Sequence, residues 1–246
     1  MPLHVLDERA LADLARASAS SGVRVHVGTA GIEKDHLARY VDLAAHFGSP
    51  HLRLVPDTGE ASDVEHALRQ ILPYCAQRGV TLALENHFDL SSEQMVAIVQ
   101  RIADPHLGIC LDVANSIGLL EKPLDTVRTL APYAVQVHLK DYALHCPRLG
   151  FVIQGVPLGQ GDLPIDGVMA ALSHLNDDIY VYLEHWLLPQ GTRQATLDWE
   201  RRWIEESVLF AQKLLSQGRT GRRSWRDLSS AAGGDAQGAA QGRQGR

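Results

Sequence analysis

Apolar residues recur along this chain at helical spacing and then at strand spacing, in regular alternation. Between Leu6 and Ser21, the positions Leu11, Leu14 and Ala15 lie on one helical face, and Gly22 follows as a C-terminal stop. A short apolar run comes next, and the helix-then-strand unit then repeats, which predicts βαβ units around a parallel sheet. The predicted helices span about 6–21, 33–47, 63–77, 91–102, 124–130, 165–175 and 196–215, and the six predicted strands span 23–27, 51–55, 81–86, 108–113, 134–139 and 179–183.

Two stretches fall outside this alternation. Residues 145–164, HCPRLGFVIQGVPLGQGDLP, read as a long loop before the last helix and strand. From Ser216 the composition changes to Gly, Ala, Gln, Ser and Arg, which cannot bury enough apolar surface to offset the entropy lost on ordering. We therefore predict one α/β domain over residues 1–215 and a disordered tail over residues 216–246.

Composition narrows the class of partner. The 246 residues carry a formal net charge of -6, which argues against nucleic acid as the main partner and favours a small molecule. Three cysteines without a CxxC pair indicate reduced thiols, and no apolar stretch is long enough to span a bilayer. The segment Asp7 to Arg9 is charged where a signal peptide would be apolar. A cytoplasmic protein with no membrane partner is expected.

The carboxyl ends of the later strands carry the candidate chemistry. The strand 81–86 ends in Glu85, the strand 108–113 carries Asp112, the strand 134–139 carries His138, and Glu184 follows the last strand. In a parallel barrel these four side chains meet at one face, where such folds keep their active sites. Alone, each residue would more often be structural, but three carboxylates converging with one imidazole favour a divalent cation.

The order of these residues resembles the xylose isomerase-like barrels, a family that includes sugar phosphate isomerases and epimerases. The resemblance runs from about Leu6 to Leu215 and rests on E-N-H at 85–87, D-x-x-N at 112–115, H-x-K-D at 138–141, and G-x-G-D at 159–162 before a strand ending in Glu. It implies a (β/α)8 TIM barrel whose fifth to eighth strands supply the metal ligands Glu85, Asp112, His138 and Glu184. It also implies that Glu85 and Glu184 exchange the substrate proton.

This resemblance defines an expected reaction. A proton next to a carbonyl is removed, an enediolate forms, and the proton returns at the same or the neighbouring carbon. A bound cation stabilises the negative oxygen; Mn²⁺ is the first expectation, with Mg²⁺, Co²⁺ or Zn²⁺ as alternatives. The expected substrate is a sugar, a sugar phosphate or a ketone derived from a polyol. An inosose-type dehydratase uses the same first step and is the alternative.

Two departures from the family pattern limit the substrate assignment. Several ketose epimerases of the family have a histidine three residues after the ligand Asp, where this chain has Asn115, and an arginine where it has Leu144. Both changes argue against a ketose 3-epimerase. Endonuclease IV, a DNA-repair relative, needs more histidines than His26 and His87 can provide and a D-x-H triplet after the ligand His, so it does not fit.

Other polar and aromatic residues near the strand ends are candidates for binding substrate or for orienting ligands. Arg53 either holds an anionic group or pairs with a nearby carboxylate. The remaining candidates also have structural interpretations: His87, Asn115, Lys140 and Trp186 for substrate, and Asn86 and Asp141 for orienting the ligands.

The beginning of the chain is short for this family. Residues 1–6 supply at most a fragment of the two strands that precede the first helix in a complete barrel. The expectation is therefore a barrel incomplete at its N-terminus with about six parallel strands. Either the start codon is placed too late, or the chain is a partial barrel whose edge is covered by a partner subunit in a homo-oligomer. A truncated, noncatalytic sugar-binding fragment is the alternative of a different class.

Overall fold

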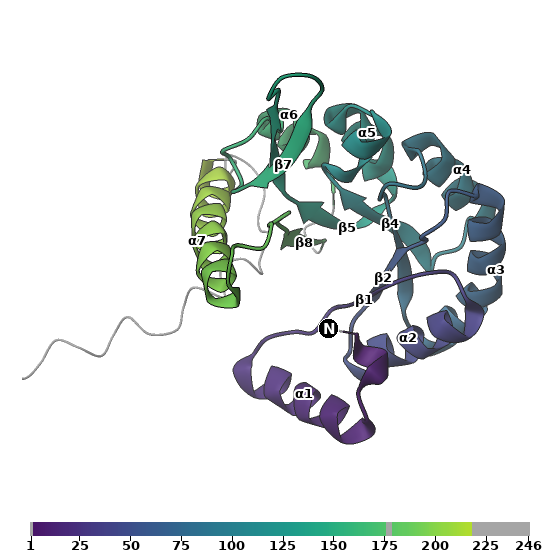
Figure 1. The fold of residues 1–246 in the computed structure, drawn as a ribbon. Helices are drawn as coiled ribbons and strands as arrows, with labels where there is room; N and C mark the ends of the chain where they lie inside the picture. The colour runs from purple at the N-terminus through teal and green to yellow at the C-terminus, as the bar shows by residue number, and fades with distance from the viewer. Residues whose placement is uncertain (1, 176–178, 218–246) are drawn as a thin grey trace, which may run out of the picture.

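The computed structural model describes residues 2–175 and 179–217, which form a curved parallel sheet with helices on its outer face (Figure 1). The sheet order β1-β2-β3-β4-β5-β8 follows the chain. The strands are β1 (Val27–Ala30), β2 (His51–Val55), β3 (Thr81–Glu85), β4 (Leu107–Asp112), β5 (Ala134–Leu139) and β8 (Tyr180–Leu183). The α-helices are α1 (Glu8–Ser21), α2 (Lys34–His46), α3 (Ala61–Arg78), α4 (Ser92–Ile102), α5 (Pro123–Leu130), α6 (Ile165–Leu172) and α7 (Arg193–Gln217).

The sheet curls into a half-barrel whose two edges are β1 and β8. Figure 1 shows α2 to α5 following one another around its outer side, with α1 and α7 at the two ends. The two edge strands β1 and β8 are not paired through their backbones, but side chains in or next to them are in contact. The ring of His26 lies 4.6 Å from that of Tyr180, and its Nδ1 is 2.7 Å from the Tyr182 hydroxyl. The prediction of an incomplete TIM-barrel-type fold with six parallel strands is confirmed for the described residues.

The core lies between the sheet and its helices. Residues that alternate along a strand point to opposite faces, so in β2 and β3 one set packs outward under the helices and the other lines the interior. Leu52, Leu54, Leu82 and Leu84 form the outward set and are fully buried. The inward set therefore includes Arg53 and Glu85, and the same alternation directs the polar residues of β4 and β5 toward one interior.

The first predicted strand, residues 23–27, is wrong by several positions. The sequence Val23 to His26 reads as strand-like, but β1 pairs with β2 only from Val27, opposite Leu52, to Ala30. The backbone of Val23 instead donates to the carbonyl of Ser18 and completes the end of α1. This local capping bond removes Val23 from the ladder, an effect that apolar content alone does not reveal.

The predicted long loop at 145–164 is also wrong in part, because it contains half of an antiparallel hairpin. Strands β6 (Asp141–His145) and β7 (Val152–Val156) pair from Asp141 opposite Val156 to His145 opposite Val152. Three short 3-10 helices complete the described elements: Leu3–Val5, Asn115–Leu119 and Ala131–Tyr133. The hairpin was missed because its outer half is exposed and lacks the alternation of apolar and polar residues that marks a half-buried strand.

The C-terminal helix runs slightly past the predicted end of the domain at residue 215. Helix α7 continues to Gln217, two residues past the predicted end. The predicted disordered tail otherwise lies outside the described residues. Among the helices of the described chain, none combines the length and the apolar character that a membrane crossing requires.

Candidate metal centre

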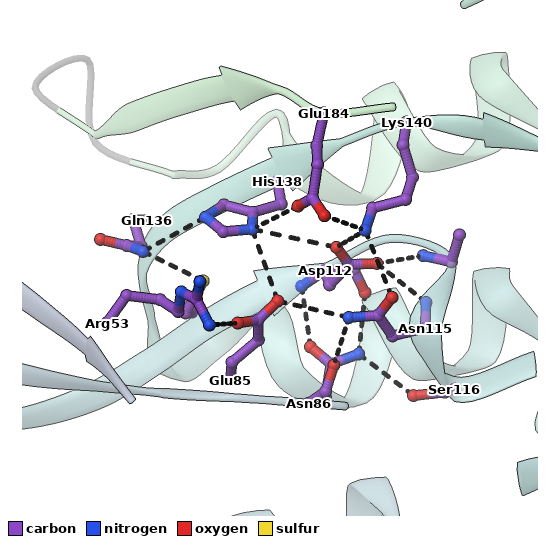
Figure 2. Close-up of polar contacts among 12 residues, drawn as sticks. Arg53, Glu85, Asn86, Asp112, Asn115, Ser116, Gln136, His138, Lys140 and Glu184 are labelled. Carbon is purple, nitrogen blue, oxygen red and sulfur yellow. Dashed lines mark hydrogen bonds and ion pairs between the residues drawn. The ribbon is translucent and has the colours of Figure 1, made fainter. Parts of the chain in front are cut away.

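The four predicted ligand residues come together at the carboxyl ends of β3, β4, β5 and β8 (Figure 2). One ligand atom each from Glu85, Asp112, His138 and Glu184 lies within 4.8 Å of all the others. Glu85 and Asp112 are the last residues of their strands, and Glu184 continues β8, since its N–H donates to the carbonyl of Leu139 over 3.0 Å. Parallel pairing thus places side chains that are distant in sequence around one point.

The imidazole of His138 is at the centre of this group. Its Nδ1 atom faces three carboxylates, with Glu184 Oε2 at 2.9 Å, Glu85 Oε1 at 3.5 Å and Asp112 Oδ2 at 3.9 Å. A nitrogen surrounded by anionic oxygens in this way either carries a proton or shares a cation with them.

Three buried atoms of these residues lack hydrogen bonds of acceptable geometry. Glu85 Oε2, Asp112 Oδ2 and His138 Nδ1 are all buried without such a partner, although ion pairs offset the charge of the two carboxylates. Glu85 and Asp112 are almost completely buried, whereas the Glu184 side chain is 39% exposed. Buried carboxylates are rarely left in this state, so the donor set fits a divalent cation bound by oxygen and one nitrogen.

Lys140 lies inside the same cluster. Its Nζ is 2.7 Å from Asp112 Oδ2 and 2.9 Å from Glu184 Oε1, and it donates to Asn115 Oδ1 over 3.2 Å. Burial alone would lower the pKa of Lys140, but the two carboxylates raise it, so the side chain is an ammonium ion. With only 1% of the side chain exposed, Lys140 is part of the centre and not a solvated residue at a strand end.

Two asparagines hold the ligand-bearing strands in place. Asn86 bridges to β4: its Oδ1 accepts from Asp112 N over 2.7 Å, and its Nδ2 donates to Asp112 O and to the Ser116 hydroxyl. Asn115 donates to Glu85 Oε1 over 3.3 Å and to Asn86 O over 3.1 Å. Asn86 thus fixes the backbone of one ligand, and Asn115 joins the carboxylate of another to Lys140.

Arg53 reaches the opposite side of Glu85. Its NH1 nitrogen lies 3.0 Å from Glu85 Oε2, while Glu85 Oε1 faces His138. The close approach of this side chain to β1 depends on Gly28, because a Cβ atom there would lie 2.9 Å from Arg53 Nε. Of the two roles foreseen for Arg53, the ion pair with a nearby carboxylate is present.

Two residues beside His138 are absent from the sequence-based candidates. These residues are Gln136 and Cys110. The Nδ1 edge of the His138 ring faces the carboxylates, whereas His138 Nε2 lies 3.4 Å from the side-chain amide nitrogen of Gln136. The same Gln136 nitrogen donates to the buried Cys110 Sγ over 3.0 Å. Gln136 is two residues before His138 in β5 and therefore points into the same interior. That spacing was the one signal available in the sequence.

The predicted aromatic and histidine contacts lie at the border of the centre. The Trp186 ring centroid is 4.9 Å from Lys140 Nζ, so Trp186 covers the ammonium ion. The His87 ring packs at 4.2 Å from that of Phe88, and within the described residues it contacts none of the four candidate ligands. The structure thus brings Trp186 to the centre and leaves His87 beside it.

Asp141 faces the glycine-containing loop. Its carboxylate accepts four backbone N–H groups, from Tyr142, Gly159, Gly161 and Leu163, at 2.8 to 3.1 Å. Within the same loop, Asp162 accepts from Leu144 N of β6. Asp141, the first residue of β6, therefore joins the chain that follows β5 to this loop.

Replacing Asp141 by alanine should lower the free energy of unfolding by roughly 2–4 kcal/mol, because it leaves buried N–H donors without an acceptor. Chemical denaturation of the purified protein measures this. Asp162→Ala is the matched control, with a smaller loss because one N–H depends on it. Equal losses in the two variants would contradict the prediction.

Two ionisable groups of the centre have strongly shifted pKa values in the metal-free protein. Burial would lower the pKa of His138, but Cys110, Glu184 and Glu85 raise it to about 12. Burial would raise the pKa of Glu184, but His138 and Lys140 lower it to about 2. The metal-free centre therefore holds a proton on His138, and a cation that binds the neutral imidazole must displace that proton.

This charge arrangement predicts how the stability of the metal-free protein depends on pH. The contribution of His138 is fully present below its unfolded pKa of 6.5 and is lost as pH rises toward 12. The contribution of Glu184 is present above 4.5 and is lost as pH falls toward 2. In EDTA, the stability difference between wild type and His138→Asn should be largest between pH 4.5 and 6.5 and shrink above it. A difference that grows from pH 7 to 10 would contradict this assignment.

Comparison with known proteins identifies the family and similar sequences. The model of the xylose isomerase-like TIM barrel family matches residues 32–207. The 3-oxo-isoapionate decarboxylase of Pectobacterium atrosepticum is 28% identical over 214 residues, which are 85% of this chain and 78% of that protein. The uncharacterized protein YihM of Escherichia coli is also 28% identical, over 70% of this chain, and the chain spans 55% of its length.

Solved structures share the fold at low sequence identity. A xylose isomerase domain protein from Planctomyces limnophilus matches with a TM-score of 0.65 and 18% identity, over 87% of this chain and 84% of that one. A xylose isomerase-like TIM barrel protein from Mycobacterium smegmatis, in complex with magnesium, matches with a TM-score of 0.60 and 14% identity, over 84% and 80%. A D-psicose 3-epimerase from Clostridium cellulolyticum matches with a TM-score of 0.60 and 14% identity, over 80% and 76%.

Proposed function

Because the chain belongs to the xylose isomerase-like TIM barrel family, we propose that it is a divalent-metal-dependent enzyme that isomerises or epimerises a sugar or sugar phosphate through an enediolate. The observation that carries the proposal is the convergence of Glu85, Asp112, His138 and Glu184 within 4.8 Å, where the buried Asp112 Oδ2 and His138 Nδ1 lack hydrogen bonds. Mn²⁺ is the proposed cation, with Mg²⁺, Co²⁺ and Zn²⁺ as alternatives. When bound, it would stabilise the developing negative charge on the carbonyl oxygen.

Glu85 and Glu184 are proposed to exchange the proton. Glu184 is 39% exposed and reachable by a ligand, whereas Glu85 is buried and fixed by Asn115 and Arg53. One carboxylate removes the proton from the carbon next to the carbonyl, and the other returns a proton to the same or the neighbouring carbon. Lys140 and Asn115, which were expected to bind substrate, are buried with their donors engaged by Asp112, Glu184, Glu85 and Asn86, so we propose that they position these groups, with His87 and Trp186 at the border of the site.

Deuterium exchange tests this proposal. The purified protein, loaded with Mn²⁺ in D2O, is incubated with a panel of ketoses, inososes and hydroxypyruvate. Deuterium entering next to the carbonyl, together with an isomerised product, would support the proposal, and a product that has lost water would indicate the inosose-type dehydratase instead. Metal binding without exchange or product on any member would favour the noncatalytic sugar-binding alternative.

A second candidate reaction is the decarboxylation of a 3-oxo acid. It is favoured by the 28% identity to a 3-oxo-isoapionate decarboxylase over 85% of this chain. Loss of CO2 from such an acid leaves an electron pair at the carbon next to the carbonyl, as proton removal does, and so gives the same kind of enolate-type intermediate. The carbon–carbon bond to the carboxylate breaks, its electrons move toward the carbonyl oxygen, and a proton then adds to that carbon. Release of CO2 from a 3-oxo sugar acid would distinguish this reaction from isomerisation.

A further inference from the structure

The guanidinium of Arg53 is a cation beside the centre with free hydrogen-bonding capacity. NH1 pairs with Glu85 Oε2, and within the described residues Glu85 is its one polar partner. The side chain is 35% exposed, which distinguishes it from the buried Lys140. Arginine carries five N–H donors in a fixed fork, and carboxylates are the groups that this fork binds in pairs. Part of the fork remains available to a ligand.

Small residues on the neighbouring strands leave room for the Arg53 side chain itself. In the sheet register Arg53 lies between Gly28 of β1 and Ala83 of β3. All three point into the interior, and a side chain at position 28 would collide with Arg53 Nε. Figure 2 shows the Arg53 side chain extended alongside Glu85, on the side of the centre away from Lys140. The two cations thus lie on opposite sides of the ligand group.

The charges of the centre do not balance once a metal is bound. Glu85, Asp112 and Glu184 provide three negative charges, and Arg53 and Lys140 provide two positive ones. A divalent cation held by a neutral imidazole leaves one positive charge in excess. Among the described residues Asp141 forms no ion pair with Arg53 or Lys140, and its carboxylate accepts four backbone N–H groups outside the cluster. Excess charge in a largely buried site is costly, and an anionic ligand would remove it.

We propose that the substrate is a carbonyl compound carrying a single carboxylate, that is, a sugar acid, and that Arg53 binds this carboxylate through the donors that Glu85 does not use. The inference rests on the proposed function in taking the substrate to be a metal-binding carbonyl compound. It adds the charge of the substrate and a specificity-determining residue. A neutral ketose would leave the excess charge and the free donors of Arg53 unmatched.

The binding affinities of two ligands of similar size test the inference without any measurement of catalysis. D-Fructose and 2-oxo-D-gluconate differ in having a CH2OH or a carboxylate next to the carbonyl carbon. Calorimetry on the Mn²⁺-loaded protein should give at least tenfold tighter binding of the acid. Arg53→Gln should weaken the acid about 10- to 100-fold more than it weakens fructose, the value of a lost hydrogen-bonded ion pair, because any effect that acts through Glu85 falls on both ligands. Arg53→Lys keeps the charge and should recover part of the loss.

The controls separate this role from support of Glu85. Mn²⁺ affinity is measured for every variant, and Arg78→Gln removes a surface arginine that pairs with Asp42. If Arg53→Gln weakened both ligands by the same factor at full Mn²⁺ occupancy, Arg53 would serve only to position Glu85 and the inference would be overturned. Wild type with normal Mn²⁺ binding but no preference for the acid would overturn the inference alone. Failure of wild type to bind Mn²⁺ would overturn the proposed function as well.

Discussion

Glu85→Gln and Glu184→Gln should each slow exchange of the substrate proton by about 10²- to 10⁴-fold at saturating Mn²⁺, the range that one general acid or base contributes. Glutamine keeps the shape of glutamate but has no charge and no basic oxygen for a proton. The two carboxylates lie on the two sides of His138 Nδ1, at 3.5 Å for Glu85 and 2.9 Å for Glu184, so neither can replace the other. Deuterium incorporation in D2O measures the exchange directly.

Loss of metal could produce the same defect, so Mn²⁺ affinity is measured for both variants and exchange is compared at full occupancy. Glu200→Gln, on the exposed side of α7, serves as the matched control and should exchange at the wild-type rate. Normal exchange in both glutamine variants at full occupancy would refute the two-carboxylate mechanism. A loss of proton exchange in Glu184→Gln but not in Glu85→Gln would show that Glu85 serves only as a metal ligand, paired with Arg53.

The sequence was sufficient to predict most of the sheet and the convergence of the ligands. Buried parallel strands are recognisable as short apolar runs, and the fold aligns their carboxyl ends, so Glu85, Asp112 and His138 could be placed together from their positions at strand ends. Both errors in the elements come from weakly patterned segments. At residues 23–27 a helix cap competes with strand pairing, and at 145–164 the half-exposed hairpin lacks a regular alternation of apolar and polar residues.

The contacts within the centre were less predictable, because they depend on distances between strands. Lys140 follows a strand end, where a solvated lysine was an equal alternative, and only the three-dimensional arrangement buries it between Asp112 and Glu184. The contacts of Gln136 and Cys110 could not be predicted, because alternation along a strand indicates only that these side chains point into the interior. Asp141 fits the family pattern, yet its four loop hydrogen bonds follow from a backbone path that a sequence pattern does not specify.

Lys140→Met should lower the free energy of unfolding of the metal-free protein by about 3–5 kcal/mol, the usual cost of removing one partner of a buried ion pair. Methionine has a similar length and keeps the packing against Trp186, so the loss arises from the uncompensated charge of Asp112, which is fully buried. Urea denaturation in EDTA measures it. Lys34→Met, on the exposed surface of α2, should change stability by no more than about 0.5 kcal/mol.

A double-mutant cycle and added metal identify the cause of that loss. Asp112→Asn removes the buried charge, so Lys140→Met should cost less in the Asp112→Asn background than in wild type. Mn²⁺ should narrow the gap between Lys140→Met and wild type, because a bound cation replaces the ammonium ion as the counter-charge of Asp112. Additive losses in the cycle would show that the loss in Lys140→Met does not arise from the charge of Asp112. A gap that Mn²⁺ leaves unchanged would show that the cation does not bind at Asp112.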